Sequence, residues 1–226
     1  MTQKKLDNYW QHSVTVDTVV FTIEENELKI LLIKRRNEPF RGLPALAGGF
    51  LQPNERLEDA ALRVLADKAG LQNVYLEQLY TFDEMFRDPR GPVISVGYFA
   101  LTPRNSIVFK NDKQIEEPGL YSLKHLPKLA FDHQSIIAYA LKRLRAKLEY
   151  TNIAYSLLPK QFTLSQLQKT YEIILGLKLD KRNFLKKYLS LGLIEQTDKF
   201  FSAGRQRPAR LYHFTSKKIA ELKRWF

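Results

Sequence analysis

The sequence predicts an α+β protein, with a mixed β-sheet covered by helices and then a small basic domain. Strand-like runs rich in β-branched residues recur between residues 14 and 101. Two stretches with apolar residues at helical spacing, 55–69 and 133–148, provide helices to cover this sheet. Residues 151–226 hold 15 of the 36 Lys and Arg but only 5 of the 24 Asp and Glu. Most of the net charge therefore lies at one end, which suggests a polyanion partner, although a solvated basic surface would give the same balance.

The composition excludes several classes of protein. The 226 residues are 44% hydrophobic and 27% charged, which is ordinary for a folded protein of one or two domains. There is no cysteine, and the four histidines are scattered, so we expect no disulfide framework, no metal site and no cofactor. No apolar run approaches the roughly 20 residues of a membrane span, and no signal peptide is recognisable. We expect a cytoplasmic protein without a membrane partner.

The predicted strands follow from β-branched and alternating runs. Residues 14–23 form the first strand, Glu24–Glu27 form a turn, and residues 28–36 return as a hairpin. After a loop, residues 46–51 lead through Gly48 and Gly49, which allow backbone angles that other residues resist. Further strands are expected at residues 74–82, 93–101 and 120–123.

Each predicted helix has recognisable ends. Residues Glu55–Asp59 place acidic side chains in the first turn of one helix, where the helix dipole favours them, and Gly70 ends it. Asp132 is the expected N-cap of a second helix, His133–Leu148. Strands and helices in this order suit a sheet that is covered on both faces.

The stretch from Gly49 to Leu71 resembles the Nudix box. The residues in register with that signature are Gly49, Glu55, Arg63, Leu65, Gly70 and Leu71. Three glutamate positions of the family are instead Val64, Asp67 and Lys68. In Nudix hydrolases those carboxylates hold the magnesium that activates water against a diphosphate, whereas valine offers no ligand and lysine repels the ion. The resemblance therefore implies a Nudix-like α/β/α sandwich without catalytic or metal-binding residues, and not an enzyme.

We place a domain boundary near residue 150. Residues 1–150 would form the Nudix-like effector-binding domain, and residues 151–226 a DNA-binding domain. The second part reads as helices 164–175 and 181–190, then β-like residues 193–197 and 209–215. Two helices followed by a basic hairpin are typical of a winged helix-turn-helix.

The DNA-binding prediction depends on cations gathered on the second helix and on the hairpin. Apolar residues of the second helix leave its other face basic, as a recognition helix requires. The start of the preceding helix could meet a phosphate through its amides. The expected DNA-binding residues are Thr163, Ser165, Gln166, Lys181, Arg182, Asn183, Lys186, Lys187, Arg205, Arg207 and Arg210. We expect Arg205→Ala and Lys187→Ala to weaken DNA binding and flatten its salt dependence.

A second resemblance extends over both predicted domains. The segments that show this resemblance are Leu157–Gln168, Tyr171–Gly176, Leu179–Phe184, Arg207–Phe214, Arg87–Gly91 and Ala130–His133. These are similar to segments of the Nudix-related transcriptional regulators. The resemblance implies a homodimeric repressor whose winged helices bind a palindromic operator in double-stranded DNA. Its effector would be ADP-ribose, as in the NAD-metabolism branch, or arabinose, as in a related branch. Pro44 and Ala47 depart from the family pattern, and Pro44 replaces an aromatic residue of the expected pocket wall.

The effector site should combine cations with polar groups above the sheet. The candidates are Arg35, Arg36, Arg41, Arg63, Asp67, Arg87 and Asp88. His133 is expected to be structural, and so is Arg63, as the family's arginine usually orients carboxylates. Each charged side chain could also form a surface ion pair.

Two other functions stay open at this point. An active ADP-ribose diphosphohydrolase with a basic accessory domain would need Glu55, Glu58, Asp59 and Asp67 to gather one magnesium ion in a nonstandard way. An RNA-binding protein would be expected to show an aromatic stacking platform, which this sequence lacks. The sequence does not name the operator or say whether the effector releases DNA.

Overall fold

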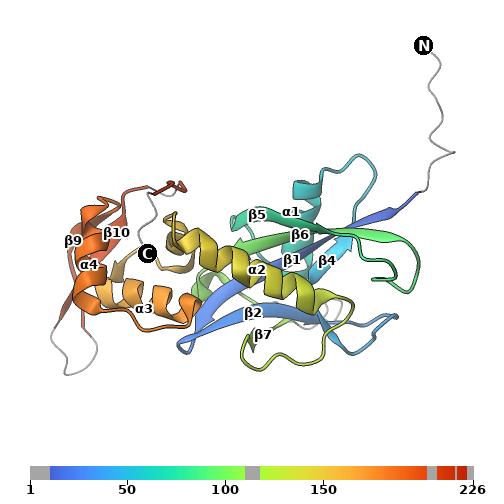
Figure 1. Cartoon of the computed structure of the whole chain (residues 1–226), viewed down its shortest axis with the longest axis horizontal. Coiled ribbons are helices and arrows are strands. Elements are labelled where there is room, and N and C mark those ends of the chain that lie inside the picture. Colours follow the sequence, from blue (N-terminus) through green and yellow to red (C-terminus); the bar gives the residue numbers. More distant parts are fainter. Residues whose placement is uncertain (1–10, 110–117, 203–207, 217, 223–226) are drawn as a thin grey trace, which may run out of the picture.

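The protein, described here by a computed structural model, is elongated, with a mixed sheet at one end and a small helical domain at the other (Figure 1). The structure describes residues 11–109, 118–202, 208–216 and 218–222. Within the described part of the chain, none of the helices combines the length and apolar character needed to cross a bilayer.

The sheet has the order β3-β2-β1-β6-β5, with β4 paired to β1 and β7 paired to β2. Its strands are β1 (Ser13–Glu24), β2 (Glu27–Lys34), β3 (Pro44–Ala45), β4 (Ala47–Phe50), β5 (Tyr75–Phe82), β6 (Val93–Leu101) and β7 (Pro118–Ser122). The central pair β1 and β6 is parallel, whereas the other pairs are antiparallel, so the sheet is mixed as predicted. Glu25 and Asn26, both at positive φ, form the tight turn between β1 and β2.

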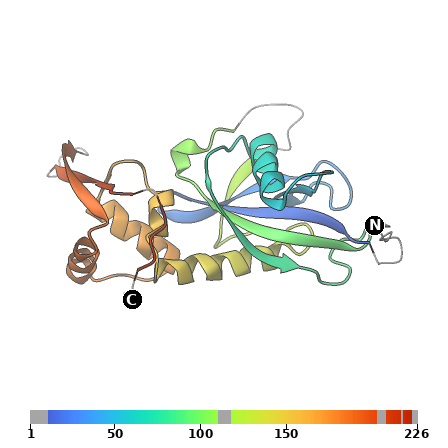
Figure 2. The ribbon, with the colours of Figure 1, turned by 90° about the horizontal axis from the view of Figure 1, so that it is seen from above.

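Two helices cover opposite faces of this sheet (Figure 2). Helix α1 (Leu57–Ala69) packs on one face, and Gly70 ends it in the left-handed conformation with φ 65°. Helix α2 (His133–Leu148) packs on the other face. Asp132 occupies the N-cap position of α2 as predicted, but its carboxylate binds Arg87 and not an amide of the first turn. The Nudix-like α/β/α sandwich is confirmed.

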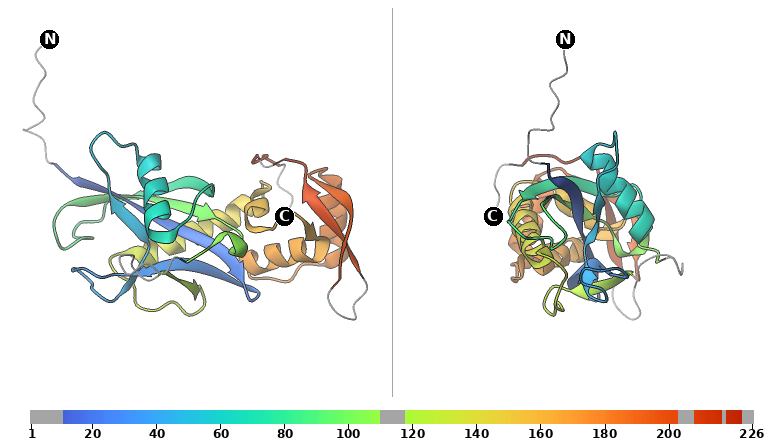
Figure 3. Two further views of the ribbon diagram at one scale, coloured as in Figure 1. Left: turned by 180° about the vertical axis from the view of Figure 1, so that it is seen from behind. Right: turned by 90° about the vertical axis from the view of Figure 1, so that its right-hand side faces the viewer.

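The C-terminal part is a winged helix. Its elements are the 3-10 helix η3 (Ile153–Leu157), β8 (Phe162–Thr163), α3 (Leu164–Leu175), α4 (Lys181–Ser190), β9 (Ile194–Phe201) and β10 (Ala209–Phe214). The three strands form a sheet of order β8-β10-β9. Tyr171 of α3 is fully buried against Phe184 and Tyr188 of α4, and this aromatic contact holds the two helices together. This part lies beyond the end of α2, at the far end from the Nudix-like sheet (Figure 3).

The two parts share one apolar core. The buried cluster beneath α2 continues through η3 into α3 and α4 without a break. Arg145 of α2 donates through Nε to the carbonyl of Ile174 in α3 at 2.8 Å. Asn152 donates to the carbonyl of Lys218 and accepts from the amide of Ala220, so the chain after β10 returns to the start of η3. The boundary near residue 150 stays a prediction, since packing continues across it.

Candidate effector pocket and nucleic-acid surface

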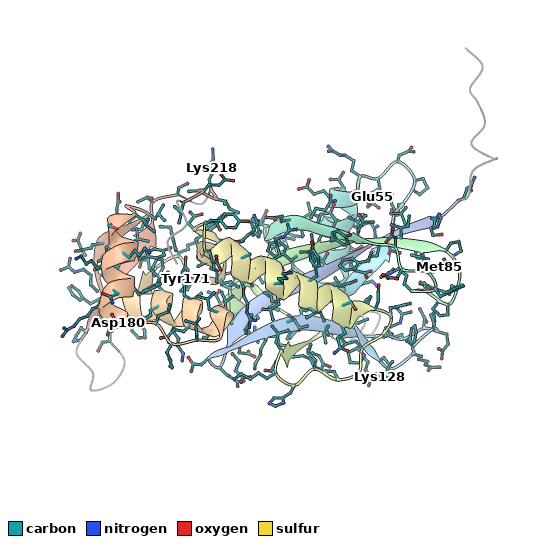
Figure 4. The ribbon with its side chains drawn as sticks, viewed as in Figure 1. Glu55, Met85, Lys128, Tyr171, Asp180 and Lys218 are labelled. Atoms are coloured by element: carbon teal, nitrogen blue, oxygen red, sulfur yellow. The ribbon has the colours of Figure 1, made fainter. Side chains whose placement is uncertain are left out.

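A pocket of about 200 Å³ lies at one end of the sheet, where β1, β4 and the loop between β5 and β6 meet. Met85 lies on that loop, and Asp180, just before α4, lies at the opposite end of the molecule (Figure 4). The charged residues that line the pocket are Asp17, Arg35, Glu38, Lys68, Arg87, Asp88, Arg90 and His133. This mixture of cations and carboxylates suits a ligand that carries both phosphate and hydroxyl groups.

The floor of the pocket is a buried network around Asp17. Ser95 donates its hydroxyl to Oδ2 of Asp17 at 2.5 Å, and Arg87 approaches the same oxygen at 3.5 Å. Arg87 also binds Asp132 through two hydrogen bonds of 2.9 and 2.6 Å. Nε2 of His133 lies 3.4 Å from Oδ1 of Asp17. The carboxylate of Asp17 on β1 is thereby joined to β6, to the loop between β5 and β6 and to the start of α2.

His133 is oriented by the backbone so that it faces Asp17. Leu46 donates its amide to Nδ1 of His133 at 2.9 Å, and Nε2 of the same ring lies toward Asp17. Burial raises the pKa of Asp17, but its contacts with His133, Ser95 and Arg87 outweigh burial and hold the pKa below its usual value. The floor therefore presents an ionised carboxylate. His133 is structural, as expected, and also forms part of the pocket wall.

Gly48 is required by the position of Asp17. The two residues are direct partners in the β1–β4 pairing. A Cβ atom at residue 48 would lie 1.9 Å from Oδ1 of Asp17 and 2.9 Å from the carbonyl oxygen of Val16. Only glycine fits there, so the first glycine of the pair serves the polar floor rather than a turn.

The rim of the pocket alternates guanidinium groups with phenyl rings. Arg35 lies over Phe131 at 4.7 Å, and Arg90 lies over Phe50 at 5.0 Å and over Phe131 at 5.8 Å. Arg35 is oriented by a 2.8 Å bond from Nε to the carbonyl of Pro39. Arg90 forms a bidentate pair with Asp88, at 2.9 and 2.6 Å. Flat groups with positive charge are suited to stacking on a base or contacting phosphate oxygens.

The side chains at the metal-binding positions of the Nudix box do not form a metal site. Val64 is buried in the core under α1, Asp67 is exposed outside the pocket, and Lys68 lines the pocket. The carboxylate of Glu55 is bound by Arg63 at 2.6 and 2.8 Å. Among the residues that the structure describes, no group of three His, Cys, Asp or Glu side chains could hold a metal ion. The donor set therefore does not fit magnesium.

Arg63 acts on the scaffold, as the sequence indicated. It joins Glu55 to the carbonyl of Phe50, which fixes the loop between β4 and α1. The hydrogen bonds from Arg63 lower the pKa of Glu55 to about 2, against the small opposing effect of burial. Neither residue lines the pocket, so the placement does not support Arg63 as an effector contact.

The structure divides the other predicted effector residues into two groups. Arg35, Arg87 and Asp88 line the pocket, although Arg87 and Asp88 already form ion pairs there. Arg36, Arg41 and Asp67 are exposed and do not line it. Pro44 does not line it either, and the aromatic wall comes from Phe50 and Phe131.

The sequence analysis missed several pocket residues, namely Asp17, Phe50, Lys68, Arg90 and Phe131. A signal existed for two of them. Asp17 interrupts an otherwise apolar, β-branched strand, and a lone carboxylate in such a strand is costly unless it is paired. Arg90 belongs to the Arg-Asp-Pro-Arg-Gly segment, whose first two residues, Arg87 and Asp88, are effector-site candidates.

The basic face of α4 forms the candidate nucleic-acid surface. Phe184 and Tyr188 are buried, and the side chains of Lys181, Arg182, Asn183, Lys186 and Lys187 are exposed. Asp180 accepts from the amide of Asn183 at 2.8 Å and so caps the helix. The exposed side chains stand at the outer end of the molecule, where a duplex could approach α4 (Figure 4).

The side chains at the start of α3 bind within the protein. Thr163 is buried, and it forms a capping box with Gln166: the Gln166 amide donates to the Thr163 hydroxyl at 3.1 Å, and the Thr163 amide donates to Oε1 of Gln166 at 2.8 Å. Ser165 and Gln166 line a groove against Pro103 and Asn105 of the sheet domain. The capping box uses the side chains of Thr163 and Gln166, and the Gln166 amide is bound to Thr163. Contact between DNA and the start of α3 stays a prediction.

Of the three wing arginines expected to bind DNA, the structure describes Arg210. Arg210 is exposed on β10, donates to Oε1 of Gln196 at 3.2 Å and lies over the ring of Phe200 at 5.0 Å. Arg205 and Arg207, which were also expected to bind DNA, lie outside the described residues.

Both parts of the chain match known domain families. The NUDIX domain family matches residues 12–142, and the NrtR DNA-binding winged helix domain matches residues 154–214. The ADPR responsive transcriptional repressor NtrR of Acinetobacter baylyi is 39% identical over 219 residues, which cover 95% of this chain and 86% of that protein. An ADP-ribose pyrophosphatase of Methanocaldococcus jannaschii is 38% identical over 134 residues, which cover 59% of this chain and 76% of that enzyme.

Solved structures of Shewanella oneidensis NrtR are also similar. Its complex with a 27mer DNA superposes with a TM-score of 0.80 at 35% identity, covering 89% of this chain and 93% of that chain. Its NUDIX domain complexed with ADP ribose gives a TM-score of 0.56 at 35% identity, covering 63% of this chain and 94% of that chain.

The fold and the two sites define a Nudix domain joined to a DNA-binding winged helix. The chain belongs to the NrtR family and is a homologue of an ADPR-responsive transcriptional repressor.

Proposed function

We propose that this protein is a transcriptional repressor that binds double-stranded DNA through α4 and the wing, and that responds to ADP-ribose bound in the Nudix domain. The observation that carries the proposal is the pairing, in one chain, of a pocket with a mixed-charge lining and a separate exposed cationic helix. The similarity to an ADPR responsive repressor over 95% of the chain supports it. Because its partner would be genomic DNA, we place the protein in the cytoplasm.

The effector would bind with its polar groups divided between floor and rim. Asp17 is an ionised acceptor at the floor, suited to ribose hydroxyl groups. Arg35 and Arg90 are suited to the diphosphate, and Phe50 and Phe131 to the adenine ring. Arg87 and Asp88 would position this lining through their ion pairs. Arabinose has no phosphate or base, so it would leave the rim unused.

We further propose that the repressor acts as a homodimer on a palindromic operator. One recognition helix reads one half-site, and two-fold symmetry in the protein matches two-fold symmetry in the operator. ADP-ribose would act by preferring a dimer geometry in which the two α4 helices no longer match the spacing of the half-sites. The continuous core from α2 to α4 provides a rigid connection for such a shift.

The test is selection of bound duplexes from a randomised DNA library with the full-length protein, followed by anisotropy titrations of the selected sequence. We expect a palindromic sequence, a protein mass in light scattering of two chains, and weaker binding when ADP-ribose is added. Free arabinose serves as the comparison ligand. A chain that selects no sequence, or whose DNA binding is unchanged by ADP-ribose, would contradict the proposal.

An alternative function is hydrolysis of ADP-ribose, favoured by the 38% identity to an ADP-ribose pyrophosphatase over the Nudix part. The side chains at the metal-binding positions oppose it, because Val64 is buried and Lys68 is a cation in the pocket. We therefore propose that the chain is not an enzyme. Incubation with ADP-ribose and Mg²⁺, followed by chromatography for AMP, decides between the two, and turnover that is lost in Asp67→Asn would establish the hydrolase.

A further inference from the structure

Lys68 occupies a special position relative to the pocket. Gly49 of β4 packs against α1 so closely that a Cβ atom there would lie 3.0 Å from Cγ2 of Val64. Residue 68 follows residue 64 by four positions, so both project from the same side of the helix. Val64 is buried under the glycine pair, and Lys68, one turn further, lines the pocket beside Gly48 and Gly49. The helix therefore presents a cation to the pocket from a position where the Nudix box has a carboxylate.

The local field of α1 favours a cation at this point. Lys68 lies in the last turn of the helix, whose carbonyl ends carry partial negative charge. A glutamate in this turn would oppose that field and would depend on a bound cation to offset it. A lysine is stabilised by the same field with no ion bound. The sequence at residue 68 thus suits a pocket that works without a metal.

The neighbouring cations differ from Lys68 in the shape of their charged groups. Arg35 and Arg90 are planar groups whose orientation is fixed by Pro39 and by Asp88. A lysine ammonium is a compact charge on a flexible stem with three donors, which can follow a phosphate oxygen. It can neutralise a diphosphate as a metal does, but it has no coordination site at which water would become a nucleophile.

We infer that Lys68 takes the place of the magnesium ion in this pocket: its ammonium group binds the diphosphate of a nucleoside-diphosphate sugar, and this binding needs no divalent cation. The inference rests on the proposed function, since it concerns the same effector. It adds a phosphate-binding residue and a metal-independent mode of recognition. The substitution at residue 68 thereby removes a metal ligand and supplies a replacement for the metal's charge in one step.

The experiment is calorimetric titration of the full-length protein with ADP-ribose, in EDTA and in excess Mg²⁺. We expect the same Kd for the unmodified protein in both buffers. Lys68→Gln should weaken binding about tenfold or more, because a charge-assisted hydrogen bond to phosphate is lost. Lys68→Arg should retain most of the affinity. Lys142→Gln, which removes the same charge from an exposed position of α2 outside the pocket, is the matched control and should bind normally.

The possible outcomes separate this inference from the proposed function. Binding that tightens many-fold with Mg²⁺ in the unmodified protein overturns the inference and requires no variant to fold. An unchanged Kd for Lys68→Gln, in a variant whose thermal unfolding matches that of the control, overturns it as well. A complete lack of ADP-ribose binding by the unmodified protein overturns the proposed effector itself.

Discussion

The pocket floor and the face of α4 both concentrate charged side chains, and they differ in their access to water. At the floor, Asp17 and Arg87 are 6% and 9% exposed, and each is bound to named partners. On α4, Lys181, Arg182 and Lys186 are exposed to solvent. Burial makes each floor charge dependent on its neighbours, whereas solvation makes each α4 charge nearly independent of them.

This difference indicates two modes of recognition in one chain. A buried network holds its groups in a single geometry and so can select the shape of a small ligand. A solvated cationic surface acts mainly through its field, which suits the regularly spaced phosphates of a duplex. Four pairs of variants test how far the contrast extends.

The largest expected effect is on the stability of the floor. Arg87→Met keeps much of the side-chain volume but leaves the buried Asp17 and the half-buried Asp132 without their cation, which should cost about 3–5 kcal/mol of unfolding free energy. Arg182→Ala on α4 should change it by less than about 0.5 kcal/mol. Urea denaturation followed by circular dichroism measures both. Equal losses in the two variants would remove the contrast.

Steric fit at the floor comes next. Gly48→Ala should destabilise the protein by about 1–3 kcal/mol, because the new methyl group overlaps Oδ1 of Asp17. Gly49→Ala is the matched neighbour and should cost less, since its nearest contact is a methyl group of Val64 at 3.0 Å. Thermal unfolding of both variants gives the comparison. A larger loss in Gly49→Ala would show that the polar floor does not require the glycine.

Salt dependence should distinguish the two regions in binding. Lys186→Ala should weaken duplex binding and reduce the slope of log K against log salt by about one. Arg35→Ala, at the pocket rim, should weaken ADP-ribose binding and leave the slope for DNA unchanged. Anisotropy titrations from low to moderate salt provide the slopes. An unaltered slope in Lys186→Ala would move the DNA surface away from α4.

The smallest expected effect is the pH dependence of the Glu55–Arg63 pair. The pKa of Glu55 is lowered to about 2 in the folded protein. The contribution of ionised Glu55 to the free energy of unfolding is therefore complete above the usual pKa of a glutamate, and it is lost as the pH falls toward about 2. The stability difference between the unmodified protein and Glu55→Gln should shrink over this range. Asp198→Asn, which alters an exposed carboxylate of β9, is the control. A difference that is constant with pH would contradict the assigned pairing.

Much of the architecture could be predicted because its signals are local. The strand at Val93–Leu101 was predicted with its observed bounds, and Gly70 and Gly176 end their helices in the left-handed conformation, at φ 65° and 74°. Such signals depend on residues within one or two turns of each other, so the sequence contains them completely. The basic face of α4 was equally readable, because helical periodicity separates its buried residues from its exposed ones.

The pocket was less predictable because its lining comes from distant segments. Asp17, Lys68 and Phe131 are far apart in the chain and meet only through the pairing of β1 with β4 and β6 and the packing of α1. Arg87 and Asp88 line the pocket, and their role as effector contacts stays a prediction; the sequence could not assign their ion-pair partners Asp132 and Arg90. The sequence determined the elements, the altered Nudix box and the basic end of the chain, since each depends on neighbouring residues. Tertiary structure decided which charges are buried together and which remain in water, because long-range packing sets both the distances between charges and their solvation.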